Sequence, residues 1–232
     1  MIAVRRAQQR GHARHGWLES FHTFSFADYH DPEHMGFRDL RVINEDFVAP
    51  GRGFGSHSHR DMEIVSVVLD GVLEHRDSMG NASEIRPGEV QRMTAGTGVT
   101  HSEFNGSQTE PVHFLQIWIL PEHPRLEPSY EQRSFPAGDR LNTLRLLASH
   151  GGEQDSIELH QDVALYGSRL EPGESVSHHA ASSRHTWVQL TNGAVTVCGE
   201  SIEAGDGVAI SGESSIELRA DEPAELLLFD LA

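Results

Sequence analysis

GFGSHSHRDMEIVSVVLDGVLEH, residues 53–75, is the stretch that decides the fold class. Two histidines, His57 and His59, stand one residue apart shortly before the β-branched run Ile64–Leu69. Valine and isoleucine pack well on a pleated surface, and the Asp70-Gly71 dipeptide that ends the run favours the positive φ angles of two-residue hairpin loops. The stretch therefore predicts a strand, a tight turn and a second strand, with a pair of histidines at the entrance.

Short apolar runs of the same kind recur along the whole chain, bounded by Gly, Pro, Asn and Asp, whereas the periodicity of long helices is scarce. Regularly spaced short strands are typical of β-sandwiches and β-barrels. We therefore predict an all-β protein. The expected strands cover residues 40–43, 64–69, 72–75, 113–120, 144–147, 186–190, 194–197 and 225–231.

A second copy of the opening pattern lies in the later half of the chain. When the two glycine turns are aligned, a proline-glycine pair and a histidine also coincide without a gap, which indicates an internal repeat. The matching landmarks are Asp70-Gly71 with Asn192-Gly193, Pro50-Gly51 with Pro172-Gly173, and His57 with His179.

The segment at residues 120–138 holds four of the ten prolines and is otherwise largely polar. This composition suits a crossing segment between two domains, although a long surface loop within one domain is the alternative. Together with the repeat, it predicts an N-terminal β-barrel at residues 1–135 and a C-terminal β-barrel at residues 136–232.

The charge and the cysteine content exclude several classes of partner. The chain has 232 residues, with 18 Lys and Arg against 35 Asp and Glu, and a formal charge of -17. Nucleic acids and anionic membranes are held by clustered basic side chains, so neither is an expected partner. The single cysteine, Cys198, fits a reducing compartment, and the N-terminus lacks the apolar segment of a secretory signal. We expect a cytoplasmic protein that acts as a monomer.

Two spaced pairs of side chains predict a metal site. Residues i and i+2 of a strand face the same side, so His57 and His59 can point together into a barrel. His101 and Glu103, in AGTGVTHSEFN at residues 95–105, have the same spacing. Three imidazole nitrogens and one carboxylate oxygen would leave open positions on a six-coordinate ion, which suits Fe(II), with Mn, Co, Ni and Cu as competitors. Zn would be nearly saturated by four such ligands and fits a structural role better.

The second copy of the pattern lacks this set of ligands. Ala181 stands where the repeat would place the counterpart of His59, and His179 and His185 alone would bind a metal poorly. We therefore expect residues 136–232 to form a barrel without a metal. The remaining histidines, among them His75, have no partner at metal-binding spacing and are interpreted as ordinary surface or core residues.

Two motifs resemble the short motifs of the cupin superfamily: His57-x-His59-x-x-x-Glu63 with Gly71, and Gly98-x-x-His101-x-x-x-Asn105. More narrowly, the sequence is similar to the pirin family, in particular to its bacterial two-cupin members with quercetin 2,3-dioxygenase activity. The resemblance runs from about residue 5 to residue 231. The segments that carry it are GWLESFHTFSFADYHDP, MGFRDLRVINEDFVAPGRGFGSHSHRDMEIVSVVLDG and MTAGTGVTHSEFN.

The resemblance implies a fold of two tandem cupin barrels, and it implies an iron site. It assigns the ligands of the ion to His57, His59, His101 and Glu103. The general cupin pattern instead has a ligand glutamate at the spacing of Glu63. We expect Glu63 to be an acid of the pocket, or a residue behind the ligands that holds a histidine in one tautomer.

The resemblance further implies a dioxygenase that opens a flavonol such as quercetin with O₂ and releases carbon monoxide. In this hypothesis a ring hydroxyl binds the ion as its anion. Glu103, or as the alternative Glu63, takes the proton. The residues that we predict to contact the aromatic substrate are Phe54, Met62, Glu63 and Gln116.

Two other functions are compatible with the same site. Some pirins contact a regulatory protein, so the first is a non-catalytic, redox-sensing module that binds a protein partner. The second is a cupin isomerase or another metal enzyme with a different substrate. A large exposed apolar surface would favour the binding module, and a deep pocket open to the metal would favour an enzyme.

Overall fold

The computed structural model describes residues 1–232 and is almost entirely β. It contains 22 strands and three short 3₁₀ helices, so the all-β prediction is confirmed. Each of the eight strands expected from the sequence overlaps a strand of the structure. None of the helices has the length and apolar character that crossing a membrane requires. The 3₁₀ helices are η1 (Ala7–Gln9), η2 (Ala137–Arg140) and η3 (Glu153–Asp155).

The chain divides into two compact units. We call them the N-terminal unit, Gly11–Ser134 with Leu159–Gln161, and the C-terminal unit, Met1–Arg10 with Phe135–Glu158 and Asp162–Ala232.

These units differ at two places from the expected division into residues 1–135 and 136–232. The first ten residues belong to the C-terminal unit because strand β1 (Ile2–Arg5) pairs with β20 (Gly207–Ser211). Residues 159–161 belong to the N-terminal unit. There the backbone N–H of His160 donates a hydrogen bond to Glu63 Oε2 at 3.2 Å. Both assignments depend on long-range pairing, which local sequence patterns do not report.

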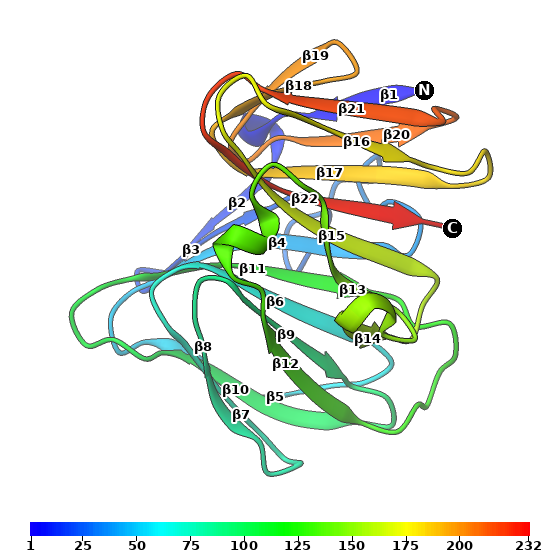
Figure 1. Ribbon diagram of the computed structural model, residues 1–232. Helices are drawn as coiled ribbons and strands as arrows, with labels where there is room; N and C mark the ends of the chain where they lie inside the picture. The colour runs from blue at the N-terminus through cyan, green and yellow to red at the C-terminus, as the bar shows by residue number, and fades with distance from the viewer. The chain divides into compact units, whose positions relative to one another are not determined.

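The N-terminal unit consists of two antiparallel sheets (Figure 1). The strand orders are β12-β9-β6-β11-β4-β3-β2 in the larger sheet and β5-β10-β7-β8 in the smaller sheet. The larger sheet contains β2 (Gly11–Arg14), β3 (Leu18–His22), β4 (Leu40–Val48), β6 (Glu63–Asp70), β9 (Glu89–Thr94), β11 (Val112–Ile119) and β12 (Ser129–Ser134). The smaller sheet contains β5 (Gly53–His59), β7 (Leu73–Asp77), β8 (Ala82–Ile85) and β10 (Val99–Asn105).

Apolar side chains from both sheets meet in one core, which shows that the sheets pack face to face. Val48, Val68 and Phe114 come from the larger sheet, and Leu73 and Ile85 come from the smaller sheet. The proline-rich segment 120–138 is more than a crossing segment, because it contains β12, which pairs with β9 and forms one edge of the larger sheet.

A row of polar side chains crosses the inner face of the larger sheet. Its members are register partners on five neighbouring strands, and all of them are buried. Adjacent strands lie about 4.8 Å apart, so the row forms a continuous polar stripe across the sheet. We call it the polar row; it consists of Gln91, Ser66, Gln116, Asn44 and His22.

The C-terminal unit repeats the same plan. Its larger sheet has the order β1-β20-β17-β22-β15-β13-β14, and its smaller sheet has the order β16-β21-β18-β19. The remaining strands of the larger sheet are β13 (Arg145–His150), β14 (Ile157–Leu159), β15 (Val163–Leu170), β17 (His185–Asn192) and β22 (Ala224–Leu231). The smaller sheet contains β16 (Ser175–His179), β18 (Ala194–Val197), β19 (Glu200–Glu203) and β21 (Ser215–Ala220).

The two glycine turns that indicated the repeat occupy equivalent places, but they do not join the strands of a hairpin. β6 belongs to the larger sheet and β7 to the smaller one, and β17 and β18 are divided in the same way. Gly71 and Gly193 have φ angles of +82° and +79°. A Cβ there would lie 2.7 Å from the carbonyl oxygen of Pro111 and 2.1 Å from that of Pro223. Each turn carries the chain from one sheet to the other, because both flanking strands present apolar residues to the same core.

Candidate metal centre

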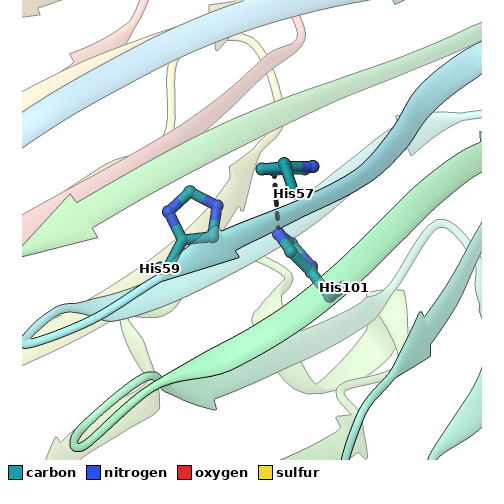
Figure 2. Close-up of side chains that lie close together, drawn as sticks. All are labelled: His57, His59 and His101. Atoms are coloured by element: carbon teal, nitrogen blue, oxygen red, sulfur yellow. Dashed lines mark hydrogen bonds between the residues drawn. The ribbon is translucent and has the colours of Figure 1, made fainter.

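Strands β5 and β10 bring three imidazoles together. His101 is the register partner of His57, and His59 lies two residues further along β5 on the same face. Figure 2 shows the three rings converging from these two neighbouring strands. One ring nitrogen from each histidine lies within 4.8 Å of the other two. The structure therefore groups three of the four side chains that the sequence predicts as ligands.

The tautomer of His57 follows from its hydrogen bond to the backbone. Its Nδ1 lies 2.8 Å from the carbonyl oxygen of Gly55, which can only accept, so Nδ1–H donates and Nε2 carries the lone pair. That Nε2 lies 3.1 Å from Nε2 of His101. Between His101 and Glu103 the pairing of β10 with β5 shifts by one residue, as at a β-bulge, and Gly55 lies in the shifted part. The irregularity places the carbonyl that orients the ring.

Two ring nitrogens in the cluster, His59 Nε2 and His101 Nδ1, are buried and have no hydrogen-bond partner. Such atoms are rare in folded proteins because each one loses its hydration without compensation. Burial, followed by the neighbouring His57, lowers the pKa of His59 to about 4 and that of His101 to about 3. At neutral pH both rings are therefore uncharged and have lone pairs available. This donor set fits a transition-metal ion.

Glu103 lies beside the imidazoles but belongs to a second group. The carboxylate, His101 and His75 each have one ligand atom within 4.8 Å of the others. Two members of the polar row hold the carboxylate of Glu103. Gln116 Nε2 donates to Oε2 at 3.1 Å, and Ser66 Oγ donates to Oε1 at 3.3 Å. Burial raises the pKa of Glu103. The four predicted ligands thus form two overlapping groups that share His101.

His75 is the residue near the site that sequence reasoning missed. It was interpreted as an ordinary histidine, yet on β7 it is the register partner of Glu103, and its side chain is fully buried. Its Nε2 lies 3.1 Å from Asp77 Oδ2, so Nε2–H donates to the carboxylate, and Nδ1 is buried without a partner. The spacing of His75 and Asp77 at i and i+2 was visible in the sequence. Only the pairing of β7 with β10 shows that His75 lies beside Glu103.

The imidazoles open onto a cavity of about 760 Å³ inside the N-terminal unit. His57, His59 and Glu103 line it, and aromatic rings form much of its wall. Trp17 and Phe54 meet edge to face at 5.2 Å, and Trp118 meets His59 in the same way at 4.9 Å. The cavity therefore combines metal-binding nitrogens with flat apolar surfaces.

Of the four residues predicted for the substrate pocket, Phe54 and Gln116 line this cavity and Met62 and Glu63 do not. Met62 packs against the apolar cluster of Ile64, Met93 and Val99. Glu63 is fully buried at the start of β6, where its Oε2 lies 3.3 Å from Nδ1 of His160. Ser66, three residues further along β6, contacts Glu103, and because side chains alternate along a strand, Glu63 lies on the opposite face.

Residues 3–119 match the family model described as Pirin. The chain belongs to the pirin family. Residues 146–231 match the model of a quercetinase C-terminal cupin domain. The predicted fold class, two cupin-type barrels in tandem, is confirmed by these two matches and by the repeated sheet order.

Pirin-family relatives are similar to this chain along its whole length. A quercetin 2,3-dioxygenase of Escherichia coli is 49% identical over 231 residues, which cover 100% of this chain and 99% of the relative. A putative quercetin 2,3-dioxygenase of Pasteurella multocida is 40% identical over 235 residues and covers 100% of both chains. The crystal structure of bacterial pirin YhhW in complex with nickel(II), from Escherichia coli, superposes with a TM-score of 0.95 at 48% identity, over 100% of this chain and 99% of that chain.

Proposed function

We propose that this pirin is a metal-dependent quercetin 2,3-dioxygenase, which cleaves a flavonol with O₂ and releases carbon monoxide. The observation that carries the proposal is the cluster of three imidazoles, two of which line an aromatic-walled cavity. The 49% identity to a quercetin 2,3-dioxygenase over the whole chain supports the substrate class.

The ion would be held by His57, His59 and His101, with Glu103 as the fourth ligand. Nitrogen and carboxylate ligands of this kind suit Fe(II), and Mn, Co, Ni, Cu and Zn can compete for them. The nickel(II) complex of bacterial pirin YhhW supports a divalent transition metal in this chain. When bound, the ion supplies Lewis-acid stabilisation of a substrate oxygen and a route for electrons to O₂.

The carboxylate of Glu103 is the base that the site offers to a ring hydroxyl. Burial raises its pKa, which makes it a better proton acceptor than an exposed carboxylate. Gln116 and Ser66 hold it in place by donating hydrogen bonds. Glu63, considered above as an alternative base, does not line the cavity and is engaged by His160.

The aromatic wall positions a planar substrate and excludes water. Phe54 lies on β5 with His57 and His59 and meets Trp17 edge to face, and Trp118 packs edge to face on Phe26 at 5.4 Å. Flat rings favour stacked or edge-to-face contact with other rings. A dry site strengthens the electrostatic stabilisation of a substrate anion.

No feature of the surface gives comparable support to the protein-binding module. The large apolar side chains that are exposed come from separate segments of the chain, whereas the cavity lies directly at the imidazoles. These exposed residues are Met1, Met35, Met79, Phe104, Leu120 and Leu141.

The test is reconstitution of the purified protein with Fe(II) without oxygen, followed by addition of quercetin and O₂. We expect loss of quercetin, uptake of O₂ and release of carbon monoxide in equal amounts. His57→Ala and His101→Ala should lose both metal and turnover, and the exposed His123→Ala is the matched control that should keep both. A fully iron-loaded protein that leaves quercetin intact would contradict the proposal.

A further inference from the structure

Four polar side chains line the same cavity on the larger sheet, apart from the imidazoles. They come from β3 and β4, are each between 3% and 5% exposed, and belong to neither metal-binding group. Nothing in the sequence singled them out. We call them the β3–β4 patch: Ser20, His22, Asn44 and Asp46.

Hydrogen bonds within the β3–β4 patch leave one acceptor and one donor unused. Ser20 Oγ donates to Oδ1 of Asp46, and His22 Nδ1 donates to Oδ1 of Asn44 at 2.9 Å. Oδ2 of Asp46 and Nδ2 of Asn44 have no hydrogen-bond partner in the protein. Because both residues line the cavity, this acceptor and this donor are available to a molecule inside it.

The charge around the β3–β4 patch indicates which chemical groups it can bind. No lysine or arginine lines the cavity. Burial, reinforced by Glu103 and Glu45, raises the pKa of Asp46 to about 7. Once ionised, a carboxylate in such surroundings is stabilised by neutral hydroxyl donors, and it repels a second carboxylate or a phosphate. The patch therefore suits the hydroxyl groups of an uncharged ring.

The distance of the β3–β4 patch from the metal site suits an elongated planar ligand. Asn44 is the register partner of Gln116, which contacts Glu103. His22 lies one strand further away. With neighbouring strands about 4.8 Å apart, the patch begins roughly 5 Å from Gln116 and extends to roughly 10 Å. The aromatic wall with Phe54 and Trp17 flanks the same cavity.

We propose that the β3–β4 patch is the subsite for hydroxyl groups on the substrate ring remote from the metal, with Asp46 Oδ2 accepting from one hydroxyl and Asn44 Nδ2 donating to its neighbour. The preferred substrate class is then an aromatic compound with two adjacent hydroxyls at the end away from the ion. This inference rests on the proposed function, because it assumes that a flavonol binds with its other end at the imidazoles.

The test measures binding without turnover. Protein loaded with Ni(II) is titrated at pH 8, where Asp46 is mostly ionised and can accept. The titrants, added in the absence of O₂, are three flavonols that carry two, one or no hydroxyls on the remote ring, and binding is followed by ligand absorbance. We expect the wild-type protein to bind the dihydroxylated flavonol at least about tenfold more tightly than the flavonol without these hydroxyls, because the latter cannot form the pair of hydrogen bonds with the patch.

Asp46→Asn keeps an oxygen for Ser20 but removes the carboxylate, and it should reduce this preference to about twofold or less. Glu19→Gln is the matched control, because Glu19 on β3 bonds Arg14 and does not line the cavity. It should leave the preference unchanged. Asn44→Leu provides a second variant of the patch if Asp46→Asn does not fold.

Three results would overturn the inference. Equal binding of the three flavonols by the wild-type protein would overturn it while leaving the proposed function in place. If Asp46→Asn weakens the binding of all three flavonols equally, Asp46 has a purely structural role. This result would also overturn the inference and leave the proposed function in place. If no flavonol binds to the metal-loaded wild-type protein, the proposed function fails, and the subsite fails with it.

Discussion

At the scale of single residues, the proposed metal site depends on side chains that hold the proposed ligands as much as on those ligands themselves. Gly55 orients His57 through its carbonyl, and Gln116 and Ser66 fix the carboxylate of Glu103. Groups of this kind select one tautomer or rotamer and so reduce the cost of binding an ion. Their contribution can be measured separately from that of the ligands.

Gln116→Leu should weaken metal binding by about 10- to 100-fold, because it removes the donor to Glu103 without changing a ligand. Competition with a chelator for Ni(II) measures the affinity. Gln91→Leu is the matched control, since Gln91 lies in the same polar row but makes no contact with Glu103. Equal affinities for the two variants would show that Gln116 does not position the carboxylate.

Asp46 should make the metal-free protein less stable as the pH rises from about 4 to about 7. Its pKa is raised from 3.8 to about 7 by burial and by nearby carboxylates. Between these values the unfolded chain releases a proton that the folded protein retains, so folding stability falls and then levels off above pH 7. Over this pH range, the free energy of unfolding of Asp46→Asn should rise by a few kcal/mol relative to that of the wild type. Urea unfolding at pH 5 and pH 8 measures the difference, and identical pH dependence of both proteins would contradict it.

At the scale of elements, the turn after β6 decides whether one strand can leave the larger sheet and the next can enter the smaller one. Gly71 makes this possible because it combines a positive φ with close approach of the chain at Pro111. The equivalent turn at Gly193 has the same two features. The Asp70-Gly71 dipeptide correctly predicted a turn, but the expectation that the two flanking strands pair as a hairpin was wrong.

Gly71→Ala should destabilise the N-terminal unit by roughly 2 kcal/mol or more, because it adds a steric clash to an unfavourable left-handed backbone. Gly80→Ala is the matched control. Gly80 has a φ of +95°, but no atom lies within 4 Å of the position of its Cβ. Gly80→Ala should lower the free energy of unfolding by about 1 kcal/mol, because only the left-handed backbone is unfavourable there. Denaturant unfolding measures both, and equal losses would show that the contact with Pro111 carries no penalty.

At the scale of the whole molecule, the order of segments along the chain does not match the unit in which each segment folds. The first ten residues complete a sheet of the C-terminal unit, and residues 159–161 belong to the N-terminal unit. In the first case Ala7 N donates to Asp206 Oδ1 at 2.7 Å, and Arg6 Nη1 donates to Oδ2 at 2.8 Å. Asp206 is buried, so these contacts compensate a carboxylate that has lost its hydration.

Deletion of residues 1–10 should lower the stability of the C-terminal unit by a few kcal/mol, because it uncovers the edge of β20 and removes the hydrogen bonds that Arg6 and Ala7 donate to the buried Asp206. Hydrogen exchange should become faster in Gly207–Ser211. The number of metal ions bound per chain should not change, since all the imidazoles of the metal site are in the N-terminal unit. Unaltered exchange in β20 would show that the N-terminal strand contributes little.

The sequence by itself determined the strands and the spacing of the proposed ligands, because both depend on neighbours along the chain. Alternation places His57 with His59 and His101 with Glu103 on common faces wherever their strands lie. The β3–β4 patch, His75 beside Glu103, and the removal of Glu63 from the cavity were decided only by tertiary structure. Each depends on which strand pairs with which and in what register. That choice is made by packing between residues far apart in the chain, and no local pattern contains it.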